Sequence, residues 1–127
     1  MIAWLLLLVL VPIAARALAN KRVPQYRHTI FATGLGLVAS PVSIGLYSTY
    51  FLGPYGIATG LAGLFLVLWH AAPGYYICTF LGVVPARSIV EGASHLVIEI
   101  ANGIFWGVIY GMLGFVLDHR RFAREAL

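Results

Sequence analysis

Charged residues are scarce in this sequence. Asp, Glu, Lys and Arg together make up 9% of its 127 residues, and only four of them are acidic. Because a water-soluble domain is about 25% charged, this chain has too few polar groups to cover a globule in water. With 61% hydrophobic residues and a mean hydropathy of +0.94, the composition predicts an all-α integral membrane protein.

Cysteine and recognisable catalytic motifs are nearly absent as well. The single cysteine, Cys78, cannot form a disulfide within the chain, and its apolar surroundings predict a buried position. The sequence contains no phosphate-binding loop, dinucleotide fingerprint, nucleophile elbow or paired-cysteine motif. We therefore predict no enzymatic activity and no cofactor. The basic residues lie in short clusters between apolar runs, as membrane orientation requires, so we expect no nucleic-acid partner.

Uncharged apolar runs predict about four transmembrane helices in one domain, 1–127. A helix needs roughly 20 apolar residues to cross the hydrocarbon core. The expected spans are residues 2–19, 29–52, 56–72 and 96–117, with a short interfacial or re-entrant helix at 73–85. Pro73 and Gly74 mark the break before that short helix. Because no Lys or Arg precedes the first run, we expect a retained first helix with an external N-terminus.

Two topologies are compatible with these spans. If 73–85 lies at the interface, the tail after the fourth span is external, and His28, His70 and Cys78 lie near the same membrane face as the start of that span. If 73–85 re-enters and returns, the tail is internal, and seven of the eight basic residues share a side, which fits the positive-inside rule better. Re-entry needs non-helical backbone under cover of protein or water. A chain of this size offers little cover, so we favour four spans.

A polar stripe is predicted at the start of the last span. Its members recur every three or four residues and so share one helical face; they are Glu91, His95, Glu99 and Asn102. The simplest interpretation is an interfacial helix end, with Glu99 hydrogen-bonded to a neighbour. Ionisable residues inside a membrane are also functional candidates. Glu91, His95 and Glu99 could therefore form a proton or ion path, continued by a hydroxyl face at Ser40, Ser43, Tyr47 and Tyr50.

A metal or haem site is the other interpretation of this stripe. His95 and a glutamate four residues away can chelate one ion from a single helix. A second helix must then contribute, and His70 is the best candidate, with His28 and Cys78 as weaker ones. The spacing matches neither the Glu-x-x-His pattern of di-iron bundles nor the zinc-protease motif, so the presence of a metal stays open.

Small residues predict how the helices pack. Four glycines share one narrow face of the last span, and two more share a face of the third. They are Gly103, Gly107, Gly111 and Gly114, and Gly56 and Gly60. Membrane helices associate through such strips because their backbones can approach closely there. The spacing is compatible with packing within one chain or between chains.

These features together predict a multi-pass protein of a bacterial-type inner or plasma membrane. We expect a structural or accessory subunit, either of a homo-oligomer or of a larger membrane complex, packed through the glycine strips and in contact with the lipid bilayer. The first alternative is a small proton- or ion-conducting channel or transporter. The second alternative is a membrane protein that binds a metal or haem.

Overall fold

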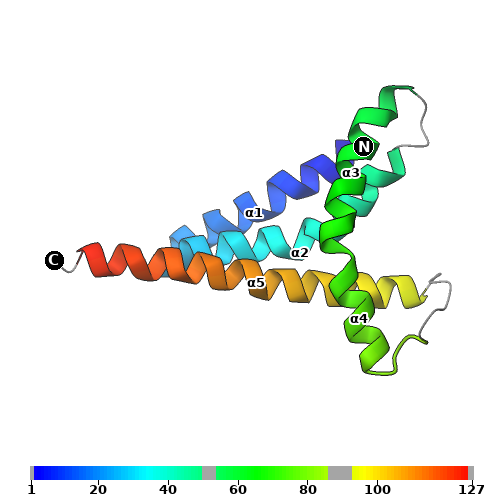
Figure 1. Ribbon diagram of the computed structural model, residues 1–127. Coiled ribbons are helices and arrows are strands. Elements are labelled where there is room, and N and C mark those ends of the chain that lie inside the picture. Colours follow the sequence, from blue (N-terminus) through cyan, green and yellow to red (C-terminus); the bar gives the residue numbers. More distant parts are fainter. Residues whose placement is uncertain (1, 50–53, 86–92, 126–127) are drawn as a thin grey trace.

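All regular elements of the computed structural model, which describes residues 2–49, 54–85 and 93–125, are helices (Figure 1). In chain order these are α1 (Ile2–Arg22), the 3-10 helix η1 (Pro24–Tyr26), α2 (Arg27–Tyr47), α3 (Pro54–His70), α4 (Ala72–Phe80) and α5 (Ala93–Glu125). Within these described residues, three stretches are long and apolar enough to cross a membrane: Pro24–Tyr47, Gly56–Phe80 and Ser94–Ala123. The all-helical, multi-pass type of fold is thus confirmed, whereas the predicted number of four spans is not.

Helices α2 and α5 form the central pair of the fold and run antiparallel. Near the start of α5, Glu99 accepts a hydrogen bond from Ser40 of α2. Near the end of α5, Asp118 accepts one from Thr29, at the start of α2. Helix α1 packs against α2 (Figure 1). The C-terminal end of α5 therefore lies beside the connection between α1 and α2.

The glycine strip of α5 is the surface that α2 occupies. A Cβ atom added to Gly103 would lie 3.0 Å from the carbonyl oxygen of Leu37, and one added to Gly114 would collide with backbone at the start of α2. The reciprocal position on α2 is Gly36, where an added Cβ would collide with the carbonyl group of Trp106. Only helices without side chains at these points can approach so closely. The strip is used within the chain.

Helices α3 and α4 follow one another in a line that crosses the α2–α5 pair near the start of α5 (Figure 1); we call them the transverse pair. They bend at Ala71, two residues before Pro73. Proline has no backbone N–H and its ring clashes with the carbonyl of the fourth residue before it, so a straight helix cannot continue there. The transverse pair connects the end of α2 to the start of α5, and these two ends lie at the same end of the molecule.

This arrangement differs from the favoured topology. Four successive crossings would make α2 and α5 parallel, whereas the structure pairs them antiparallel. The alternative of a re-entrant 73–85 also differs, because α4 continues the line of α3 instead of turning back (Figure 1). A turn then follows, in which Gly82 takes a φ of 70°, a conformation that favours glycine. Hydropathy locates apolar segments, but it does not fix the direction in which each one runs.

The second predicted glycine strip lies on the inward face of the transverse pair. Gly56 and Gly60 are both buried, as is Gly63 in the same helix. A Cβ atom on Gly63 would collide with the backbone of Tyr47, at the end of α2. Glycine at this position thus allows α3 to cross α2 at close range.

Candidate functional site

Buried and partly buried polar side chains meet where the transverse pair crosses the α2–α5 pair. We call this set the junction cluster; it consists of Ser40, His70, Glu99, Asn102, Trp106 and Tyr110. Asn102, Trp106 and Tyr110 recur every four residues and so lie along one face of α5. That face meets the bend between α3 and α4. Residues from three parts of the chain are thereby joined at one point.

Asn102 holds the bend itself. Its side chain is completely buried, its Oδ1 accepts a hydrogen bond from the Gly74 N–H (2.6 Å), and its Nδ2 donates one to the Ala71 carbonyl (3.0 Å). The first N–H groups and the last carbonyls of a helix have no partner within the helix. Asn102 therefore caps the end of α3 and the beginning of α4 from a third helix.

Glu99 joins the junction cluster to α2. Its Oε2 accepts a hydrogen bond from the Ser40 hydroxyl (2.7 Å), and its Oε1 lies 3.5 Å from the donating Nδ2 of Asn102. Ser40 is fully buried, whereas Glu99 is partly exposed. Glu99 also lines a hollow of about 350 Å³ whose other walls are apolar. Its carboxylate is thus partnered on one side and borders an apolar surface on the other.

His70 ends α3 and is fixed through its ring and its backbone. The ring is buried, and its Nδ1 lies 2.9 Å from the Leu66 carbonyl. Because a carbonyl only accepts, Nδ1 is the donor. The other ring nitrogen, Nε2, lies 2.7 Å from the Tyr110 hydroxyl, and Trp106 donates its indole N–H to the His70 carbonyl (2.9 Å). His70 and Tyr110 border a cavity of about 180 Å³ that Ser43 also lines.

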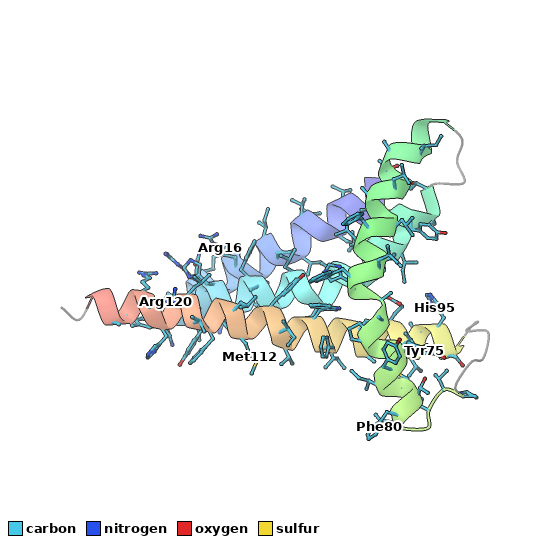
Figure 2. All side chains as sticks on the ribbon, viewed as in Figure 1. Arg16, Tyr75, Phe80, His95, Met112 and Arg120 are labelled. Carbon is cyan, nitrogen blue, oxygen red and sulfur yellow. The ribbon has the colours of Figure 1, made fainter. Side chains whose placement is uncertain are left out.

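The predicted polar stripe is only partly brought together. Glu99 and Asn102 lie in the junction cluster, and Asn102 contacts the residue that follows His70. His95 is exposed near the start of α5 (Figure 2), and Glu91 lies outside the described residues. In the described part of the chain, no three His, Cys, Asp or Glu side chains lie close enough together to hold a metal ion.

The weaker metal candidates lie elsewhere. Cys78 is buried in an apolar cluster with Val84 and Ile98. His28 is at the far end of the α2–α5 pair, where its Nδ1 lies 2.6 Å from a carboxylate oxygen of Asp118. Neither residue belongs to the junction cluster. Sequence reasoning offered both as ligands because it could not assign them to an end of the molecule.

A second set of buried polar contacts lies at the far end of the α2–α5 pair, around Asp118. Asp118 is buried, and its carboxylate accepts hydrogen bonds from the backbone N–H groups of His28 (3.2 Å) and Thr29 (2.8 Å) and from the Thr29 hydroxyl (2.8 Å). Helix α2 begins at Arg27, so these are N–H groups of its first turn, where a negative charge is also favourable. Asp118 thus caps α2 from another helix.

Three of these residues are not among the candidates that the sequence predicts: Trp106, Tyr110 and Asp118. The signal that identifies two of them is the four-residue spacing of hydrogen-bonding side chains after Asn102. The signal for Asp118 is its position as the only acidic residue directly after the last apolar run.

The side chains of the junction cluster form hydrogen bonds that hold parts of the chain together. Each of its side chains bonds another chain segment, and the backbone groups that it engages lie at a helix break, where partners are required. Such a set joins helices and orients them. No protein-family model matches the sequence, and the chain has no match among curated proteins or solved structures.

Proposed function

We propose that this protein is a structural membrane subunit that pairs with a second copy of itself, without enzymatic activity of its own. The observation that carries the proposal is the outward face of the transverse pair. Large apolar side chains are exposed there, at intervals of four and three residues from Leu61 to Leu68 and of four residues from Tyr76 to Phe80. We call them the transverse stripe, and they are Leu61, Phe65, Leu68, Trp69, Tyr76 and Phe80. Phe80 projects from the end of α4 (Figure 2).

The transverse stripe requires apolar surroundings. Phe65 and Phe80 are 81% and 90% exposed, and the sequence has no Lys, Arg, Asp or Glu between residues 55 and 84. A helix that lies at the membrane surface normally has a charged face toward water, which the transverse pair lacks. In a pair of copies, the rings of each transverse stripe would contact the apolar side chains of the other copy, and no charged group would be buried.

The internal polar groups support a structural role over a transport role. Asn102, Glu99 and His70 are each engaged by other parts of the same chain. Asn102 in particular accepts a hydrogen bond from the N–H of Gly74, in the first turn of α4, where N–H groups have no partner within the helix. In this proposal the polar residues hold the transverse pair in place, and the transverse pair presents its outer face to the partner.

The membrane arrangement that we propose has three crossings, made by α1, α2 and α5. The stretch Gly56–Phe80 is long and apolar enough to cross as well, but in this arrangement the transverse pair lies inside the apolar layer near one membrane face and does not cross. The opposite end of the molecule carries basic residues of the C-terminal half of α1 and of the end of α5, including Arg16 and Arg120 (Figure 2). The positive-inside rule assigns that end to the cytoplasm.

The test is the mass of the purified protein in detergent, measured by light scattering over a range of protein-to-detergent ratios. We expect a dimer. The double variant Phe65→Ala/Trp69→Ala should weaken its association at least about tenfold, because aromatic side chains at the centre of an interface are typical hot spots. The matched control is Leu113→Ala/Leu117→Ala, at exposed positions of α5, and it should associate as the wild type does.

Two outcomes would contradict the proposal. One is a wild-type protein that stays monomeric at every ratio. The other is equal association of the stripe variant and the control variant, since the interface would then lie elsewhere. Helical circular dichroism of each variant establishes that it has folded, because the exposed positions of both variants should tolerate alanine.

A further inference from the structure

An open apolar groove follows the seam between α2 and α5. Its larger section has a volume of about 630 Å³. Gly107 and Gly111, which have no side chains, form part of its lining together with exposed residues such as Val108 and Met112. The hollow beside Glu99, of about 350 Å³, continues the groove toward the start of α5, and the two sections share Leu37 and Ile104.

The two ends of this groove differ in charge. The larger section ends at Phe115 and Val116. The His119 ring stacks on Phe115 with 6.3 Å between ring centroids, and the exposed Arg120 follows Val116 by one helical turn. The other section ends at the Glu99 carboxylate. A ligand with a negative head and an apolar tail is therefore favoured in one orientation only.

The basic end of the groove belongs to the basic end of the whole molecule. Arg16 and Arg120, from opposite ends of the sequence, both lie there (Figure 2). The described Lys and Arg side chains at this end are Arg16, Lys21, Arg22, Arg27, Arg120 and Arg121. The carboxylate of Asp118 does not oppose them at the surface, because it is buried beneath its bonds to His28 and Thr29.

We propose that the groove binds one acyl chain of an anionic phospholipid from the leaflet at the basic end. At 1.5 Å per residue, the section from Ile104 to Val116 is roughly 18 Å long, close to the roughly 15 Å of hydrocarbon in one leaflet. The phosphate then lies level with Arg120. Basic pockets between transmembrane helices are the usual sites for anionic headgroups. The site is distinct from the transverse stripe and does not depend on how many copies assemble.

The test is native mass spectrometry of the protein in mixed micelles of detergent and one added lipid. The probes are phosphatidylglycerol and phosphatidylcholine with identical acyl chains. We expect the wild type to retain phosphatidylglycerol at about fivefold lower lipid concentration than phosphatidylcholine. Arg120→Gln should reduce this difference and leave the binding of phosphatidylcholine unchanged, because it removes a charge at the groove end but no apolar lining.

The acyl-chain part of the proposal is tested by filling the groove. Met112→Trp adds a large ring to the lining and should lower phosphatidylglycerol occupancy at least about fivefold. Leu113→Trp is the matched control, because Leu113 is equally exposed on α5 but does not line the groove, and it should bind lipid as the wild type does. Val108→Phe provides a second filling variant if Met112→Trp does not fold.

Three results would overturn the proposal. The first is equal retention of the two lipids by the wild type, which removes the role of charge. The second is equal occupancy in the filling variants and in Leu113→Trp, which removes the groove. The third is a wild type that binds neither lipid specifically, as expected if a partner helix or a second copy occupies the groove.

Discussion

Gly36→Ala is expected to lower the free energy of unfolding by about 3 kcal/mol, at the upper end of what one overpacked methyl group costs. The added Cβ would collide with the carbonyl group of Trp106 and would lie 2.7 Å from the amide nitrogen of Gly107. Both are backbone atoms of α5, so neither can rotate aside. The helices would have to separate along their whole contact. The loss is measurable by titration with sodium dodecyl sulfate, followed by circular dichroism.

The matched control is Gly107→Ala, at the same interface. Its Cβ would meet the Leu37 side chain at 3.2 Å, which can move by a few tenths of an ångström. The nearest backbone atom, the Thr33 carbonyl oxygen, would be at the ordinary van der Waals distance of 3.7 Å. Alanine also favours the helix over glycine by up to about 1 kcal/mol. We therefore expect Gly107→Ala to be close to neutral. If both variants lose the same free energy of unfolding, α2 and α5 do not approach each other more closely at Gly36 than at Gly107.

Asn102→Leu is expected to lower the free energy of unfolding by about 3 kcal/mol, because it removes the side chain that bonds both Gly74 and Ala71. The N–H of Gly74 would stay buried without this hydrogen bond, at about 1–3 kcal/mol for such a group. The carbonyl of Ala71, at the N-cap of α4, would lose the bond that Nδ2 donates. Interhelical hydrogen bonds in membranes often contribute less than 1 kcal/mol. The bond to Gly74 is different, because an N–H in the first turn of a helix has no partner within that helix and meets no water in the apolar layer.

Hydrogen exchange gives the most specific readout of this change. Asn102→Leu should speed exchange at the first turn of α4 more than at the centre of α5. The matched control is Ser40→Ala, which removes one bond to Glu99 and no backbone partner, so it should cost about 1 kcal/mol and leave exchange in α4 unchanged. Equal exchange in α4 for the two variants would mean that Asn102 does not hold the bend.

The positions of the helices could be predicted from the sequence because apolar runs and breakers carry that information locally. The predicted 96–117 span lies within α5, and the break at Pro73 separates α3 from α4 as expected. The direction of the transverse pair could not be predicted. In lipid, hydrophobic burial does not choose between helix arrangements, and the choice depends on individual contacts such as those of Asn102.

The candidate site could be predicted in part for the same reason. The spacing of Glu99 and Asn102 identified a polar face of the last span, but not what that face contacts. The partners of Asn102 are the backbone groups of Ala71 and Gly74. Because backbone carbonyl and N–H groups are not specific to a residue type, no pattern of side chains predicts these contacts. Asp118 shows the same limit, since two of its partners are backbone N–H groups.

In the arrangement that we propose, α2 and α5 cross the membrane in opposite directions and the transverse pair connects them on one side. Single cysteines at Lys21→Cys, His95→Cys and Arg120→Cys, in a Cys78→Ala background, test it by labelling intact and permeabilised cells with a membrane-impermeant maleimide. We expect positions 21 and 120 to react on the same side of the membrane and position 95 to react on the other. Labelling of positions 21 and 120 on opposite sides would contradict it.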